Sequence, residues 1–126
     1  MALMFLNGEG MRGGTAHAHI AGSAFVGEAR TAPLYRFLAF GEEFPGLLPV
    51  DRGGAPIAGE LYDVPLNKLQ QLLRAEPPQL ELSIVTLSDG QLSFGMVVRA
   101  GQEINSAITD ITEVGSWRRQ IGRAHV

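Results

Sequence analysis

The residues of this sequence best suited to chemistry begin with a glycine-rich segment near the N-terminus. Residues 7–14 read NGEGMRGG, so four of these eight positions are glycine. Glycine adopts positive φ readily, and consecutive backbone N–H groups in such a turn form a nest that binds a carboxylate or another anion. We therefore predict a loop that binds a small anionic substrate or ligand, with a plain connecting loop as the alternative. The predicted substrate-binding residues of this loop are Asn7, Gly8, Glu9, Gly10, Met11 and Arg12.

One acidic residue, Glu76, is the best candidate for catalysis. It follows a predicted helix over residues 65–75 and precedes Pro77. A carboxylate at that place faces the negative end of the helix dipole and lies near apolar residues, and both effects raise its pKa. A raised pKa suits a general acid or base near neutral pH, whereas the alternative is an exposed glutamate at a helix end. We also predict that Tyr35 places its hydroxyl in the same cleft, with a tyrosine at the edge of the core as the alternative.

Other familiar catalytic arrangements are missing from the sequence. It contains no cysteine, which excludes disulfides, thiolate nucleophiles and thiolate metal ligands. No serine is convincingly combined with a histidine and an acid. His17 and His19 lie two residues apart without a third ligand at a suitable spacing, so we predict no metal site and no cofactor.

The composition is that of a small globular domain. Hydrophobic residues make up 45% of the 126 residues and charged residues 18%, so we assign residues 1–126 to a single domain with its own core. The net charge is −3 and the basic residues are scattered, so we predict neither a nucleic-acid partner nor a membrane partner. The lack of cysteine and of a signal-peptide pattern leads us to expect a cytoplasmic location. The sequence does not predict the oligomeric state.

The order of apolar and polar residues predicts an α+β domain, in which strands outnumber helices. Strands are predicted at residues 2–6, 23–29, 34–40, 55–64 and 108–111, with a hairpin of residues 81–87 and 91–99. Helices are predicted at residues 15–20, 65–75 and 113–121. Residues 41–54 contain two prolines and four glycines and are predicted to form a loop.

Several short motifs occur in a specific order along the chain. They are Arg30–Arg36 (RTAPLYR), Pro45–Leu47 (PGL), Gly53–Gly54, Leu87–Gly90 (LSDG) and Asp110–Arg118 (DITEVGSWR). In this order they resemble the C-terminal domain of allophanate hydrolase, which belongs to the γ-glutamylcyclotransferase-like group of folds. The resemblance extends over residues 3–121 and implies a mixed, partly closed β-barrel with flanking short helices.

The same resemblance implies a small-molecule enzyme that acts on a C–N bond of a small carboxylated amide or urea derivative. In cyclotransferases a glutamate after the barrel helix is the acid and base, and Glu76 lies near that position. One alternative is a γ-glutamylcyclotransferase-type enzyme that releases 5-oxoproline. The other is a non-catalytic accessory module that binds a small anion or a separate partner amidase.

Overall fold

The computed structural model describes residues 2–104 and 107–124, and within them strands dominate. The eight strands of this part are β1 (Ala2–Leu6), β2 (Ala24–Arg30), β3 (Tyr35–Phe40), β4 (Phe44–Pro49), β5 (Ala58–Val64), β6 (Leu80–Thr86), β7 (Leu92–Val98) and β8 (Ile108–Asp110). The helices are α1 (Leu66–Ala75), α2 (Trp117–Ala124) and two short 3-10 helices, η1 (His17–Ile20) and η2 (Gln102–Ile104). No helix of the described residues is long and apolar enough to cross a bilayer.

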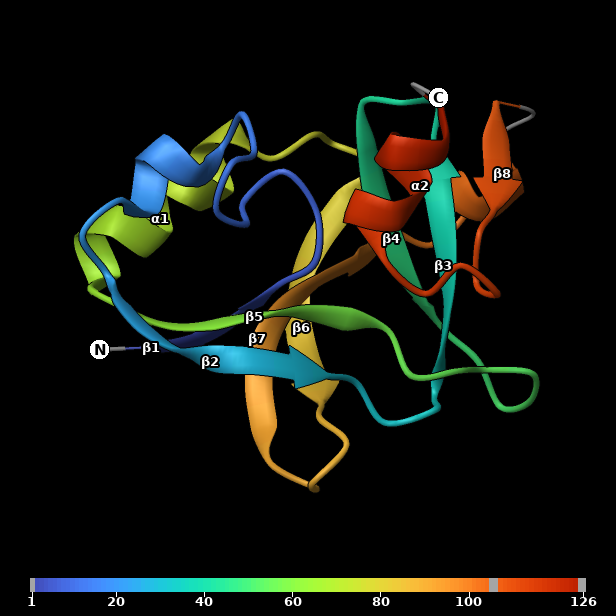
Figure 1. Ribbon diagram of the computed structural model, residues 1–126, viewed down its shortest axis with the longest axis horizontal. Helices are drawn as coiled ribbons and strands as arrows, with labels where there is room; N and C mark the ends of the chain where they lie inside the picture. The colour runs from blue at the N-terminus through green and yellow to red at the C-terminus, as the bar shows by residue number, and fades with distance from the viewer. Residues whose placement is uncertain (1, 105–106, 125–126) are drawn as a thin grey trace.

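All eight strands join one mixed sheet. Its order is β2-β5-β1-β7-β4-β3-β8, and β6 pairs with β7 outside that path. β7 runs parallel to both β1 and β4, whereas the other pairs are antiparallel. A bridge between Thr31 and Leu87, with a hydrogen bond from Ala32 N to Thr86 O, brings the ends of β2 and β6 together and partly closes the barrel (Figure 1). The predicted α+β class and partly closed β-barrel are therefore confirmed.

The hairpin of β6 and β7 forms where the sequence places it. The two strands pair from Leu80–Val98 at one end to Thr86–Leu92 at the other. Gly90 has φ +86° in the turn, and Asp89 Oδ1 accepts a hydrogen bond from Gln91 N at 2.9 Å. These are the contacts that a Ser-Asp-Gly turn is expected to make, so the local sequence sets the register of the hairpin.

The core lies inside the curled sheet and under the helices. Phe5, Phe37, Leu47 and Trp117 are among its most completely buried side chains. α1 buries Leu69 and Leu72 and packs beside η1, and the loop after β1 runs between this pair of helices and α2 (Figure 1). The loop after β1 therefore lies in contact with elements from the early, middle and late parts of the sequence.

Three predictions about local structure are wrong. Residues 41–54 are not all loop, because they include the strand β4, in which Pro45 and Gly46 are residue types that usually indicate a loop. A Cβ added to Gly46 would lie 2.7 Å from atoms of Leu80 and Val98, so glycine at this position allows β4 to approach β6 and β7 closely. The helix expected from Thr15 is shorter and begins after Ala16. The Thr15 side chain donates a hydrogen bond to Glu9 instead of capping a helix. The closing helix, predicted from residue 113, starts at Trp117.

Candidate functional site

A cavity of about 300 Å³ opens between the loop after β1, the end of α1 and the start of β4. Four predicted loop residues, Asn7 to Gly10, line one side, and Glu76 lines the side formed by α1. The apolar part of the wall comes from Phe5, Leu6, Phe44, Pro45, Leu72, Leu80 and Met96. The fold therefore brings the predicted catalytic residue and two thirds of the predicted loop to one cavity, although about 70 residues separate them in the sequence.

Glu76 is placed by the end of α1. Its backbone is already extended, with φ −69° and ψ 145°, because it precedes Pro77 and cannot continue the helix. The side chain is largely buried among apolar residues of the wall, and this burial raises its pKa to about 7. Within the described residues, the carboxyl group has no hydrogen bond or ion pair. Near neutral pH both forms of this group are therefore populated, an acid that can give a proton and a base that can take one.

Asn7 belongs to the lining of the same cavity and has an unused donor. Its side chain is only 7% exposed, and its Nδ2 has no hydrogen-bond partner in the described structure. A buried amide left in this state is unfavourable by about 1–3 kcal/mol, so it indicates a place where a ligand or a water accepts a hydrogen bond. Because Nδ2 itself is buried, the amide must turn toward the cavity before it can hold a carbonyl or carboxylate oxygen there.

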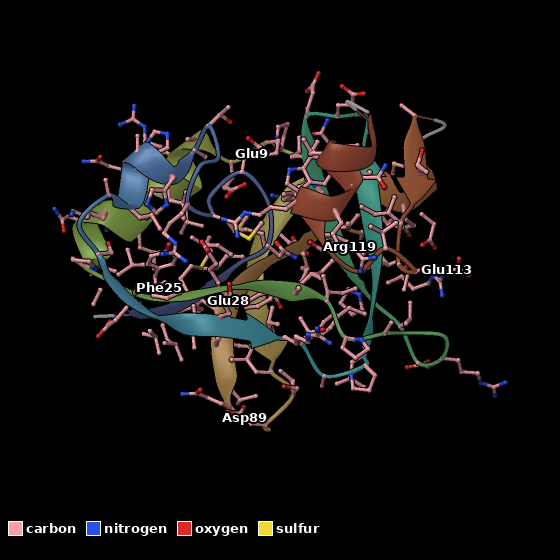
Figure 2. The ribbon with its side chains drawn as sticks, viewed as in Figure 1. Glu9, Phe25, Glu28, Asp89, Glu113 and Arg119 are labelled. Atoms are coloured by element: carbon pink, nitrogen blue, oxygen red, sulfur yellow. The ribbon has the colours of Figure 1, made fainter. Side chains whose placement is uncertain are left out.

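Glu9 is fixed as an anion by its surroundings. Its Oε1 accepts hydrogen bonds from Thr15 N and Oγ1 at 3.0 and 3.1 Å, and its Oε2 accepts one from Trp117 Nε1 at 2.6 Å. Partial burial raises the pKa of Glu9, but these hydrogen bonds outweigh it and hold the pKa below its ordinary value. Figure 2 labels this residue in the upper part of the view, between α1 and α2. Glu9 therefore joins the loop to α2, whereas Glu76 keeps a free carboxyl group.

The glycines of the loop serve close packing more than unusual dihedral angles. Gly13 alone in residues 7–14 has positive φ, at +87°. A Cβ on Gly8 would lie 2.6 Å from Pro45 Cδ, and one on Gly14 would lie 2.1 Å from Glu9 O. Two N–H groups of the expected nest already have partners, because Met11 N donates to Gly8 O and Arg12 N donates to Glu60.

Met11, Arg12 and Tyr35 lie outside the cavity. Met11 is buried, and Tyr35 is 5% exposed with its hydroxyl oxygen accepting a hydrogen bond from Thr86 N at 2.9 Å. Tyr35 therefore occupies the position given as its alternative, at the edge of the core. Arg12 turns away from the cavity toward Glu60, so the structure separates these three residues from the five that it brings together.

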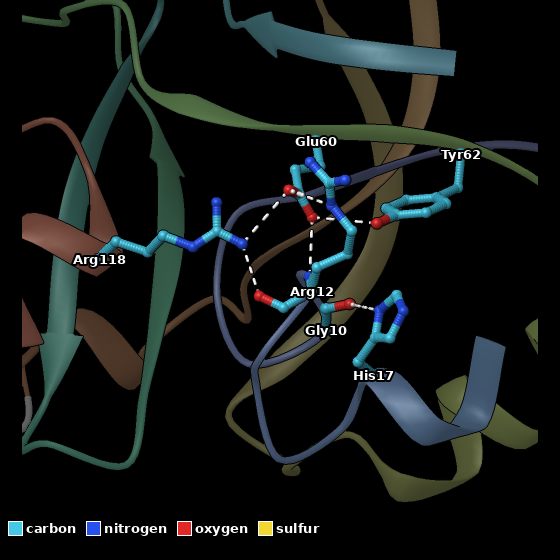
Figure 3. A network of polar contacts seen from close by, with 6 residues as sticks. All are labelled: Gly10, Arg12, His17, Glu60, Tyr62 and Arg118. Carbon is cyan, nitrogen blue, oxygen red and sulfur yellow. Dashed lines mark hydrogen bonds and ion pairs between the residues drawn. The ribbon is translucent and has the colours of Figure 1, made fainter. Parts of the chain in front are cut away.

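A charge cluster around the buried Glu60 supports the loop from the other side, as Figure 3 shows. Glu60 is 1% exposed and accepts hydrogen bonds from Arg12 N and Nε, from Tyr62 Oη at 3.1 Å and from Arg118 Nη2 at 3.2 Å. Burial raises the pKa of Glu60, but these donors outweigh it and lower the pKa overall. His17 Nδ1 lies 2.9 Å from Gly10 O at the edge of the cluster.

Sequence reasoning missed this cluster. A glutamate inside an apolar strand is a signal for a buried, paired carboxylate, but the sequence alone does not indicate that Arg12 and Arg118 are its partners. Glu43 at the cavity and Trp117 under Glu9 were also not predicted as parts of the site. No group of three metal-ligating side chains occurs in residues 2–104 and 107–124.

The arrangement is that of a small-molecule site. The cavity is large enough for a small organic compound, and its lining combines an apolar wall, an asparagine with an unpaired amide donor and a carboxyl group with a pKa of about 7. Such a site can position a carbonyl group and move a proton to or from it.

Comparison with solved structures gives the same fold. "c4763, a uropathogenic E. coli-specific protein" is 32% identical, with 96% of this chain and 95% of that chain covered and a TM-score of 0.88. The urea amidolyase of K. lactis is 20% identical over 99% of this chain, with a TM-score of 0.91, and this chain spans only 8% of that protein. An AIG2-like protein from Mus musculus is 23% identical, with 81% of this chain and 78% of that chain covered and a TM-score of 0.60.

No curated protein matches the chain significantly. The family model for the allophanate hydrolase C-terminal domain, however, matches residues 2–122, which is nearly the full length. The match covers both the loop after β1 and Glu76, and it agrees with the barrel described above. The chain belongs to the allophanate hydrolase C-terminal domain family.

Proposed function

We propose that this domain is a small-molecule enzyme that acts on a C–N bond of a small carboxylated amide or urea derivative, with Glu76 as the proton carrier. The observation that carries the proposal is the position of Glu76 in the cavity wall, with a pKa of about 7 and no hydrogen-bond partner in the described structure. Family membership supports it, because allophanate hydrolase acts on a small urea derivative.

In this proposal Asn7 holds an oxygen of the substrate, either the carbonyl oxygen or a carboxylate oxygen, through its unused Nδ2. Glu76 gives a proton to the departing nitrogen or takes one from the attacking group. The apolar wall limits water around this carboxyl group and keeps its pKa high.

The charges of the cavity restrict how a carboxylated substrate is held. The lining residues include Glu9, Glu43 and Glu76, and none of those described is lysine, arginine or histidine. A substrate carboxylate therefore depends on Asn7 and on backbone N–H groups of the loop. It also binds better when Glu76 is protonated, since one negative charge is then removed from the wall.

The test is turnover of allophanate, small amides and γ-glutamyl compounds by the wild type and by Glu76→Gln. General acid–base catalysis contributes about 100- to 10,000-fold, so we expect kcat to fall by that range while ligand affinity changes little. Glu42→Gln is a matched control, because it removes an exposed carboxylate that does not line the cavity. Release of 5-oxoproline would identify the cyclotransferase alternative. Equal rates for the wild type and Glu76→Gln would contradict the role of Glu76.

The second candidate function is an accessory module that binds a small anion or a partner amidase without catalysis. The relatives favour it in one respect: this chain spans 21% of the K. lactis allophanate hydrolase and 8% of the urea amidolyase, so the domain occurs there as part of larger proteins. If the wild type turns over none of the compounds but binds one of them, or binds an amidase, this second function is supported.

A further inference from the structure

The outer edge of β6 has unpaired backbone groups. Among the described strands, β6 pairs only with β7. Hydrogen bonds from Leu87 N to Gln91 O and from Arg99 N to Gln79 O show that odd-numbered residues on this side of the hairpin bond across to the β7 side. In an antiparallel pair the bonding residues alternate, so the even-numbered residues of β6 direct their N–H and C=O groups away from β7.

Both ends of this edge are already closed. Thr86 N donates to Tyr35 Oη and Thr86 O accepts from Ala32 N, each at 2.9 Å. At the other end, Leu80 O accepts a hydrogen bond from Arg99 Nη2 at 3.2 Å. Between these ends lie Leu82 and Ile84, whose backbone N–H and C=O groups have no partner in the described part of the chain.

Exposed apolar side chains accompany this open edge. Leu82 is 38% exposed and Ile84 is 54% exposed. The hairpin extends away from α1 and α2 to its tip at Asp89, so no helix covers this segment (Figures 1 and 2). Soluble proteins usually protect a strand edge with charges, proline or a covering element, and residues 82–84 have none of these. The edge is therefore suited to accept another strand.

We propose that this edge binds a second copy of the chain, with the two β6 strands antiparallel about a two-fold axis at Ser83. Leu82 then lies opposite Ile84 of the partner subunit, and Ile84 opposite Leu82 of the partner subunit. Each copy has two free N–H and two free C=O groups, so the pairing makes four hydrogen bonds and leaves none of these groups unpaired.

The sequence of β6 fits this register and no neighbouring one. A two-fold axis at Leu82 would require groups of Leu80, whose C=O is already bonded to Arg99, and an axis at Ile84 would require Thr86, whose N–H and C=O are both engaged. With the axis at Ser83, apolar side chains meet apolar side chains. The one charged residue of the strand, Glu81, remains with Arg99 at 3.3 Å and does not meet its own copy.

The interface is small. An interface of four hydrogen bonds and four apolar side chains buries less accessible surface than the roughly 1,200 Å² that stable complexes bury. The dimer is therefore reversible, and its amount depends on protein concentration. Its formation is separate from the cavity at Glu76, and neither proposal depends on the other.

Sedimentation equilibrium over a range of protein concentrations tests the proposal. The wild type should show a monomer–dimer equilibrium, and Leu82→Lys and Ile84→Lys should each raise the dimer dissociation constant by about tenfold, since each removes two apolar cross-strand pairs and introduces like charges. Leu92→Lys is the matched control. Leu92 is 61% exposed but lies on β7, away from the edge, so this variant should dimerise as the wild type does.

Amide hydrogen exchange is a second test of dimer formation, and it uses only the wild-type protein. The N–H groups of Leu82 and Ile84 should exchange more slowly as protein concentration rises, whereas exposed amides elsewhere should not change. A protein that stays monomeric at every concentration would overturn the proposal. So would a dimer that Leu92→Lys disrupts and Ile84→Lys does not, and so would pairing of the edge only with a segment of an amidase.

Discussion

Glu76 and Glu9 show how the surroundings of a carboxyl group decide its use. They line the same cavity, yet the pKa of Glu9 is lowered by three hydrogen bonds that outweigh its partial burial, and burial raises the pKa of Glu76 to about 7. Glu9 is an anion that holds structure, and Glu76 can change its protonation state near neutral pH.

The raised pKa of Glu76 predicts a specific pH dependence of stability. The unfolded carboxyl group has its ordinary pKa near 4.5 and the folded one a pKa of about 7, so the unfolded state loses this proton first as pH rises. Stability from this group is therefore full below about pH 4.5 and is lost progressively up to about pH 7, by ~3 kcal/mol. The Glu76→Gln variant has no ionisable group at this position, so it does not lose this stability as the pH rises. Denaturant unfolding should show the variant gaining stability over the wild type between pH 5 and pH 8, and a constant difference would contradict the raised pKa.

Asn7 predicts a separation of binding from stability. Asn7→Ala removes a buried donor that has no partner in the described structure, so the free energy of unfolding should not fall. Ligand affinity should fall by about 5- to 30-fold, the usual value of one hydrogen bond to a ligand. Calorimetry on a bound substrate or analogue measures this. Ser23→Ala is the control, because Ser23 Oγ is also buried without a partner but does not line the cavity; equal affinity in both variants would remove Asn7 from the site.

At the scale of elements, α2 holds the loop after β1 in place. Trp117 Nε1 donates to Glu9 Oε2 at 2.6 Å, and Arg118 Nη2 donates to Arg12 O at 2.5 Å and to the buried Glu60. These contacts connect the last helix to a loop about 105 residues earlier in the sequence. The cavity therefore depends on an element that does not line it.

Trp117→Phe tests this connection while keeping an aromatic ring in the core. Loss of a hydrogen bond to a partly buried carboxylate should lower the free energy of unfolding by about 1–3 kcal/mol, and the pKa of Glu9 should rise. Denaturant unfolding and a titration of Glu9 by nuclear magnetic resonance measure the two effects. If the loop amides of residues 8–15 exchange no faster than in the wild type, α2 does not hold the loop.

Much of the architecture could be predicted from local patterns in the sequence. The hairpin of β6 and β7 follows from alternation around Ser-Asp-Gly, and α1 follows from its leucine spacing between two prolines. β4 could not be predicted, because Pro45 and Gly46 are common in loops and become acceptable in a strand only through its close contact with β6 and β7. Glu76 and the loop after β1 could each be predicted from local sequence. The position of Tyr35 could not, because it depends on the hydrogen bond from Thr86 N, a residue far away in the sequence.

At the scale of the whole molecule, the fold brings the loop after β1 and the end of α1 to one cavity, with α2 against the loop. Asn7 follows β1 and Glu76 follows α1, and both line the cavity. The loop after β1 is held by the hydrogen bond from Trp117 of α2 to Glu9. The relative from E. coli is covered over 95% of its length by this chain, so the same barrel spans nearly all of that protein.

The most direct test of the role of Glu76 is the pH dependence of kcat/KM for the wild type and Glu76→Gln on a substrate that the wild type turns over. We expect an ionisation near pH 7 in the wild-type profile, because the free enzyme carries a carboxyl group with that pKa, and its disappearance in the variant along with most of the rate. A wild-type profile without that ionisation, or the same ionisation in Glu76→Gln, would contradict the assignment of Glu76 as the proton carrier.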